Sequence, residues 1–230
     1  MNAYAPTERT RVRRLPQRAT YDAGAVHQVL DAGLVCTVSF VEDGRPVTIP
    51  TAYARVGDAL VFHGSAKSRT LLAAAAGAEL CVTVTHLDGL VLARSAFHHS
   101  VNYRSVVVFG RAIVVTDPQH KLALLEAFFE RLYPGRWSAA RRPNEQELKA
   151  TLVVELPLCE VVAKVRTGGP LDDDADMTLP VWAGVIPLRL EAAQPEPARD
   201  LAHECAPPAV NWPPGGAAIP DHDRDGRRAS

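Results

Sequence analysis

The stretch LVCTVSFV-EDG-RPVTIPTAYAR, residues 34–55, decides the fold class of this chain. Two runs rich in apolar and β-branched residues flank Glu42-Asp43-Gly44, and Asp and Gly tolerate the positive φ that a tight hairpin turn needs. Pro46 and Pro50 have no backbone N–H, so the second run belongs at a sheet edge or in an irregular stretch. The segment therefore predicts two antiparallel strands joined by a short turn.

Similar runs continue along the chain. Strands are expected over residues 59–63, 79–87, 90–93, 104–116 and 151–166. Asp88-Gly89 is expected to turn the second run into the third, and Pro157 to break the last. Gly110 indicates a bulge or a sharp bend, as barrels use at corners. Short connections between strands favour a small antiparallel barrel or sandwich, and the lack of regular strand–helix alternation excludes a doubly wound parallel sheet.

Helices are expected between these strands. One short helix is capped by Asp22, a second covers residues 68–76, and another covers residues 144–149. The clearest helix covers residues 117–132, because Asp117-Pro118 supplies a cap and a first-turn proline. Its predicted apolar stripe consists of Leu122, Leu125, Phe128, Phe129 and Leu132.

Composition indicates how the chain is organised and which classes of partner it does not suit. The 230 residues are 47% hydrophobic and 22% charged, which is typical of a folded globular protein. Residues 1–20 are expected to be a loose arm, residues 21–190 the folded domain, and the proline-rich residues 191–230 a disordered tail. A net charge of −1 and the lack of a long apolar run argue against nucleic acid and membrane partners.

The four cysteines form no C-x-x-C pair, which argues against a cysteine-rich zinc site. They are expected to be small buried hydrophobes. Since nothing in the sequence demands an oxidising compartment, a reduced cytoplasmic protein is expected.

The run HGSAKSR, residues 63–69, is the first candidate for chemistry. It lies between a strand and a helix start, where free N–H groups, two hydroxyls and two cations would suit a phosphate. The spacing of a P-loop is missing. The alternative interpretation is an ordinary polar loop with a helix cap.

Histidines form the second candidate set: His63, His86, His98 and His99. A metal ion needs three or four converging ligands, but the adjacent His98 and His99 would point to opposite faces of a strand. No metal-binding spacing occurs, so no metal held by the protein alone is expected.

Two further segments allow two interpretations each. Arg104 lies at the start of a predicted strand, where it either keeps an edge soluble or points at an anionic ligand. Trp182 lies in PVWAGVIPLR, residues 180–189, which either covers a ligand or partner or packs as a C-terminal arm.

Taken in order, these segments resemble the pyridoxamine 5′-phosphate oxidase-like family of flavin-binding split barrels, in particular its nitroimidazole-reductase-like branch. The resemblance covers roughly residues 18–190 and implies a mainly β protein with inserted helices, an antiparallel six-stranded split β-barrel that binds FMN at a homodimer interface. The segments that carry it are GRPVTIPTAY at 44–53, LVFHGS at 60–65, KSR at 67–69, RSVVVFG at 104–110 and the segment around Trp182.

The resemblance also implies cofactor-binding residues. Those expected to hold the FMN phosphate are His63, Gly64, Ser65, Lys67, Ser68 and Arg69. Arg104-Ser105 is similar to a family Arg-Gln pair, with serine replacing the glutamine that meets the flavin. Thr51 and Tyr53 are two residues apart, so they share one face of their strand. Tyr53 is therefore expected in an apolar wall beside the flavin.

The C-terminal segment departs from the family pattern. Trp182 is expected to reach the partner subunit's flavin, but its spacing to Arg189 is one residue longer than in the family. Glu191 stands where the family has a histidine. These departures argue against pyridoxamine-phosphate oxidation and favour a flavin reductase or nitroreductase-like role.

The expected function is that of an FMN-dependent oxidoreductase, which reduces a small molecule with electrons from NAD(P)H. The flavin would supply the redox step, since the side chains carry no electron carrier of their own. The alternative is a non-enzymatic protein on the same barrel. It would store or sense flavin, or bind haem through His63, His98 or His99.

Overall fold

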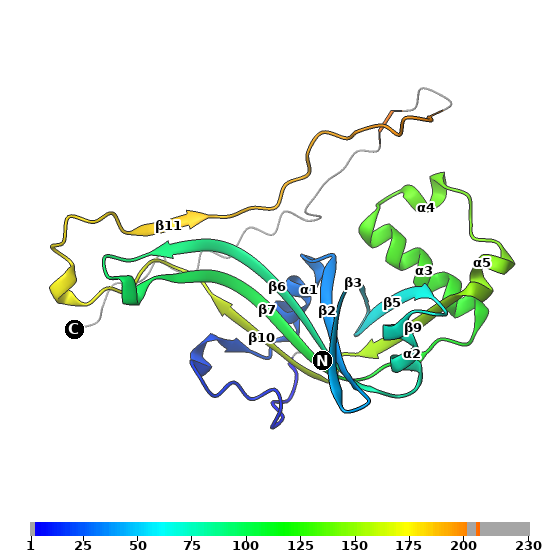
Figure 1. Cartoon of the computed structure of the whole chain (residues 1–230), viewed down its shortest axis with the longest axis horizontal. Coiled ribbons are helices and arrows are strands. Elements are labelled where there is room, and N and C mark those ends of the chain that lie inside the picture. The colour runs from blue at the N-terminus through cyan, green and yellow to red at the C-terminus, as the bar shows by residue number, and fades with distance from the viewer. Residues whose placement is uncertain (1–2, 202–205, 208–230) are drawn as a thin grey trace.

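The computed structural model describes residues 3–201 and 206–207 and confirms a mainly β fold, the predicted antiparallel split barrel with inserted helices (Figure 1). The larger sheet has the strand order β1-β10-β7-β6-β2-β3, with β11 added beside β6. The smaller sheet has the order β4-β5-β9-β8. Among the described residues, no helix combines the length and apolarity needed to span a bilayer.

Most element bounds lie within a few residues of the predicted ones, although β7 begins at Ser100 rather than at residue 104. The strands are β1 (Ala19–Thr20), β2 (Val35–Glu42), β3 (Arg45–Ala52), β4 (Ala54–Val56), β5 (Ala59–Ser65), β6 (Glu79–Leu92), β7 (Ser100–Arg111), β8 (Ile113–Val114), β9 (Thr151–Pro157), β10 (Glu160–Arg166) and β11 (Gly184–Pro187). The helices are α1 (Ala23–Asp31), α2 (Arg69–Ala75), α3 (Pro118–Leu132), α4 (Arg136–Ala139) and α5 (Glu145–Ala150). The sequence had not indicated β1, α4 or β11.

The deciding hairpin forms as predicted. β2 and β3 pair antiparallel from Val35↔Ala52 to Glu42↔Arg45. Asp43 and Gly44 have φ values of 51° and 72°, which a two-residue turn between twisted strands requires. The helix caps are also confirmed, because Asp22 and Asp117 accept hydrogen bonds from backbone N–H groups in the first turns of α1 and α3.

The predicted turn at Asp88-Gly89 is wrong. β6 runs straight through it and forms a long arm with β7 (Figure 1), with only a bulge between Leu87 and Gly89. Asp88 does not need turn geometry, because its buried carboxylate accepts two hydrogen bonds from Arg104 at 2.8 and 2.9 Å. The chain instead reverses at a 3-10 turn, Ala96–His98.

The segment around Trp182 runs back along this arm (Figure 1). β11 pairs antiparallel with β6 from Gly184↔Leu92 to Pro187↔Gly89. Leu188 N donates to Asp88 O at 3.0 Å, so the residue that follows β11 is hydrogen-bonded to the bulge in β6.

Two hydrophobic clusters lie on opposite sides of the smaller sheet. The barrel core collects buried residues of both sheets with α1 and α2, among them Leu60 and Leu156. The second cluster lies between that sheet and α3, and includes Val61 and Phe128. The predicted stripe of α3 is corrected at Leu122, which is 38% exposed, because the buried face is centred on Leu124, Leu125 and Phe128.

The ends of the chain differ from each other. Residues 3–20, expected to be a loose arm, make specific contacts with the domain. Tyr4 is buried, and its N–H donates to Tyr21 O at 2.8 Å. Arg9 forms ion pairs with Glu79 and Glu160 of the large sheet. The predicted disorder of residues 191–230 falls largely outside the described residues, and the described residues 191–201 are exposed and form no helix or strand.

Candidate functional site

The alternation of side chains along β5 builds the site. Leu60 and Phe62 point into the barrel core, whereas Val61 belongs to the cluster under α3. His63 continues the outer face, where its ring meets Phe128 edge-on at a centroid distance of 4.4 Å and Phe129 at 5.7 Å. The strand therefore places an imidazole under α3 rather than in the barrel.

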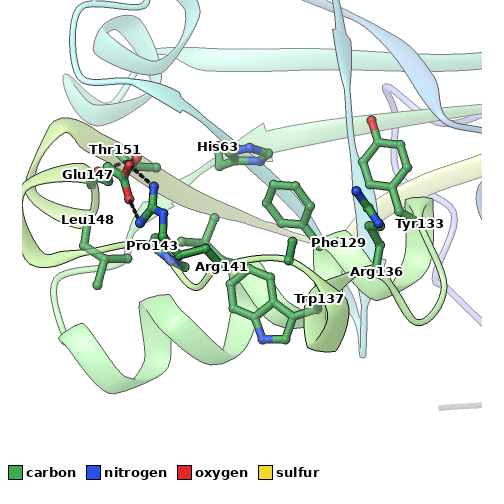
Figure 2. A pocket seen from close by; sticks show the side chains of 12 residues that line it. His63, Phe129, Tyr133, Arg136, Trp137, Arg141, Pro143, Glu147, Leu148 and Thr151 are labelled. Carbon is green, nitrogen blue, oxygen red and sulfur yellow. Dashed lines mark hydrogen bonds and ion pairs between the residues drawn. The ribbon is translucent and has the colours of Figure 1, made fainter. Parts of the chain in front are cut away.

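A cavity of about 500 Å³ opens beside His63, between β5, β9 and helices α3, α4 and α5 (Figure 2). We call it the α3 chamber. Its walls are mostly apolar, with Leu125, Phe129, Trp137, Pro143 and Leu148 as the main contributors. Arg136 and Arg141 lie at its edges. The lining combines flat aromatic surface, one imidazole, two cations and the carboxylate of Glu147.

Neither ring nitrogen of His63 has a hydrogen-bond partner among the described residues, and Nδ1 is fully buried. Burial lowers the pKa of His63. The imidazole is therefore neutral at pH 7, with a lone pair available to a metal centre. Trp137 Nε1, in the chamber wall, is likewise buried without a partner. Unpaired buried polar groups are rare in proteins and require an explanation.

The segment after α3 closes the chamber. Asn144 and Glu147 form a reciprocal capping box at the start of α5. Arg141 donates to both carboxylate oxygens of Glu147 at 2.6 and 3.0 Å, and this pairing lowers the pKa of Glu147 to about 2. Arg142 lies over the Trp137 ring at 4.6 Å. These contacts hold the connection between α4 and α5 against the aromatic wall.

The predicted phosphate residues other than His63 lie together at the corner between β5 and α2, residues 64–69, which we call the β5–α2 corner. His63, which was also expected to hold the phosphate, instead faces α3 and the chamber, because side chains alternate along β5. Ser65 Oγ accepts from Lys67 N at 3.2 Å, and Ser68 is the N-cap of α2 without a side-chain cap bond. Arg69 donates to Glu42 at 2.6 and 2.9 Å, whereas Lys67 forms no ion pair with any described residue. One cation and one hydroxyl at this corner are free.

Thr51 and Tyr53 do share one face with Ile49, but that face is the barrel interior. Tyr53 is 1% exposed, and its hydroxyl donates to Leu30 O at 2.5 Å. The expected wall beside a flavin is therefore corrected for Tyr53. Thr51 and Tyr53 share a face as predicted. That face does not line a flavin site, because α1 covers it.

Arg104 and Ser105 belong to β7, and Trp182 lies two residues before β11, whereas the predicted phosphate residues lie at the end of β5 and the start of α2. Arg104 is paired with Asp88, and Ser105 Oγ donates to Lys164 O at 3.2 Å. Trp182 is 63% exposed next to Gly184. Within one chain, these residues do not meet the phosphate residues.

The other histidines already have partners. His86 Nε2 bonds Val29 O at 2.9 Å in the barrel. At the tip of the arm, His98 pairs with Asp173 and His99 Nδ1 bonds Ser95 O. In the described part of the chain, no three His, Cys, Asp or Glu side chains converge as a metal site. Of the three histidines considered as haem ligands, His63 is the one beside the α3 chamber.

Comparison with known proteins agrees with this geometry. A family model described as pyridoxamine 5′-phosphate oxidase matches residues 22–165, more than half of the chain. The chain belongs to this family. The predicted family membership is thus confirmed. Among curated proteins, none matches the chain.

Solved structures add nearer relatives of this family member. It is 41% identical to the flavocytochrome Anf3 from Azotobacter vinelandii, with a TM-score of 0.83, covering 89% of this chain and 95% of that one. It is 38% identical to an FAD and haem binding protein from Mycobacterium smegmatis, with a TM-score of 0.80 and coverages of 83% and 94%. A Bacteroides thetaiotaomicron protein named for 5-nitroimidazole antibiotic resistance shares the fold at 16% identity, with a TM-score of 0.55 and coverages of 64% and 86%.

Sequence reasoning identified His63 in this family member but missed the chamber beside it. The missed residues are Phe129, Tyr133, Arg136, Trp137 and Arg141. A signal was present, because residues 133–142, directly after the predicted helix, contain two aromatic residues and three arginines. Such a run is not explained by an amphipathic helix alone, and its aromatic side chains suit the wall of a ligand site.

Proposed function

We propose that this protein is a redox protein that binds haem in the α3 chamber and the phosphate of a flavin nucleotide at the β5–α2 corner. His63 is the observation that carries the proposal, since its buried Nδ1 has no partner and its ring borders a cavity of about 500 Å³. Two relatives support the pairing of cofactors: one is a flavocytochrome, and the other binds FAD and haem.

The residues of the α3 chamber fit haem. Histidine is a common axial ligand of haem iron, and burial keeps His63 neutral, as a ligand must be. The chamber volume falls within the range of about 300–1,000 Å³ that small-molecule sites occupy. Phe129 and Trp137 offer flat walls for a planar macrocycle. Haem, when bound, supplies one-electron chemistry that the side chains lack.

The β5–α2 corner fits a flavin phosphate. Lys67 has no ion pair with a described residue, and the Ser68 hydroxyl makes no cap bond. Arg69 shares its charge with Glu42, so Lys67 is the stronger candidate for the phosphate. FMN, expected from the family resemblance, and FAD, bound by the mycobacterial relative, both carry this ribityl phosphate. Flavin supplies hydride and electron transfer.

The absorbance spectrum of the purified protein tests both cofactors together. The proposal expects flavin bands and a Soret band, either as isolated or after titration with haem and flavin. Chromatography of the flavin released on denaturation distinguishes FMN from FAD. A protein that takes up neither cofactor would reject the proposal, and uptake of flavin alone would reject its haem part.

The phosphate assignment is tested with Lys67→Ala and Arg69→Ala. Loss of one charge-assisted phosphate contact is expected to weaken FMN binding about tenfold, with the larger effect at Lys67. Riboflavin, which lacks the phosphate, is the control ligand. Equal losses for FMN and riboflavin would show that neither cation holds the phosphate.

We further propose a homodimer, in which Trp182 covers the flavin of the partner subunit. Trp182 is 63% exposed, and the neighbouring arm also exposes Leu87 and Val101 at 50% and 39%. An apolar surface of this kind favours a covered face. Trp182→Ala should therefore weaken both flavin binding and dimerisation in analytical ultracentrifugation. If both survive the substitution, Trp182 has no such role.

The reaction proposed is reduction of a small molecule with electrons from NAD(P)H. The alternative is storage or sensing of flavin or haem without turnover. Anaerobic addition of NADH or NADPH discriminates between these functions, because only a reductase bleaches its flavin at a catalytic rate. The cysteines Cys36, Cys81 and Cys159 are free, which supports a reduced, cytoplasmic location.

A further inference from the structure

Two arginines lie at the edges of the α3 chamber, and their surroundings differ (Figure 2). Both terminal nitrogens of Arg141 donate to Glu147, and Asn144 N also donates to that carboxylate at 2.8 Å. The side chain of Arg136 makes no hydrogen bond or ion pair with any described residue. One cation of the rim is therefore neutralised, and the other is available.

The chamber constrains what Arg136 can meet. Its walls between the two arginines are apolar, with Phe129 and Trp137 prominent (Figure 2). A ligand that fills this space must bury an apolar, flat body, and its charged groups must stay at the rim, where water reaches them. Arg136 is exposed and lies at that rim, beside Tyr133.

We infer that Arg136 recognises a carboxylate of the chamber's ligand, so that the site selects haem with free propionates over uncharged macrocycles. This inference rests on the haem site proposed above. A guanidinium offers a planar fork of N–H donors that matches a carboxylate, which an ammonium does not. A carboxylate that approached Arg141 would have to displace Glu147, so Arg141 is not the determinant.

The test compares haem with haem dimethyl ester, whose propionates are blocked. Both are titrated into the cofactor-free full chain, and binding is followed by the Soret band and by quenching of tryptophan fluorescence. The variants are Arg136→Ala and Arg136→Lys. Lys149→Ala is the matched control, because Lys149 is an exposed cation on α5 that does not line the chamber.

Arg136→Ala is expected to weaken haem binding about tenfold and to leave the dimethyl ester unchanged. Arg136→Lys should restore part of the loss, and Lys149→Ala should change neither ligand. Because Arg136 is exposed, the preference of the native chain for haem over its ester should also shrink as salt rises.

Two results would overturn the inference. If the native chain binds haem and Arg136→Ala weakens both ligands equally, or neither, Arg136 does not recognise a carboxylate, although the haem site stands. If the native chain binds neither macrocycle, the proposed haem site fails and the inference fails with it. Circular dichroism of each variant verifies that the fold is retained.

Discussion

The barrel core and the α3 chamber differ in whether their buried polar groups are hydrogen-bonded. In the barrel, the Tyr53 hydroxyl donates to Leu30 O and His86 Nε2 bonds Val29 O. In the chamber, His63 Nδ1 and Trp137 Nε1 are buried without partners. The barrel core is formed by tightly buried side chains, and these two buried polar groups are paired within it. The chamber leaves space and bonding capacity open, as a ligand site does.

One strand creates this difference. Successive residues of β5 point to opposite faces, so Phe62 completes the barrel while His63 faces α3. The barrel face is sealed by α1 and α2. The outer face is covered by α3 and by the short helices α4 and α5, which leave a cavity of about 500 Å³.

The largest expected effect contrasts the two faces directly. Leu60→Ala should reduce the free energy of unfolding by about 2–5 kcal/mol, because Leu60 is fully buried in the barrel core. Phe129→Ala should cost clearly less, because Phe129 is only partly buried and borders an existing cavity. Urea unfolding without cofactors measures both. Equal losses would show that the chamber is packed like the barrel core and would remove the contrast.

A smaller effect is expected for Tyr53→Phe. Removing the hydroxyl leaves Leu30 O without this buried hydrogen bond, which should cost about 1–2 kcal/mol of stability. Flavin affinity should not change, because the ring lies inside the barrel. Isothermal titration with FMN provides the check. A fall in FMN affinity at unchanged fold would show that Tyr53 belongs to the cofactor site.

Residue patterns predicted the barrel well because its determinants are local. The turn at Asp43-Gly44 and the cap at Asp117 act within a few residues. The turn expected at Asp88-Gly89 failed because β6 continues through it, and Arg104, 16 residues further along the chain, binds the Asp88 carboxylate there. A long-range ion pair of this kind cannot be read from a turn motif.

The candidate site was predictable only in part. His63 and the residues of the β5–α2 corner are adjacent in sequence, so their proximity followed from the chain itself. The α3 chamber joins His63 to Trp137 and Leu148, which are distant in sequence and meet only through the packing of α4 and α5. Tyr53 was placed on the wrong side because alternation fixes which residues share a face, and tertiary packing fixes which face is inside.

The smallest effect concerns pH. Burial lowers the pKa of both His63 and His86, so each is neutral in the folded chain where its unfolded counterpart, with a pKa of about 6.5, takes up a proton. The unfolded state then binds more protons, and stability should fall as pH drops below about 6.5. Each histidine contributes at most about 1.4 kcal/mol per pH unit.

Thermal unfolding between pH 7.5 and 5 measures this slope. His63→Ala should flatten it without removing a hydrogen bond, because the His63 ring has no hydrogen-bond partner among the described residues. His86→Ala should flatten it and also lower stability at pH 7.5, since the bond to Val29 O is lost. A slope that is unchanged in His63→Ala would contradict a neutral His63 in the folded state.

Haem titration of His63→Ala is the decisive test of haem binding in the α3 chamber, with His120→Ala as the matched control. His120 lies on the exposed side of α3, where it pairs with Glu155 and does not line the chamber. Partners one shell beyond a metal typically contribute 10–100-fold to affinity, so loss of the ligand itself should weaken haem binding by more than about 100-fold. A shifted Soret band is expected in the native chain and in His120→Ala, and none in His63→Ala at the same haem concentration. A native spectrum and affinity in His63→Ala would contradict haem binding in the chamber.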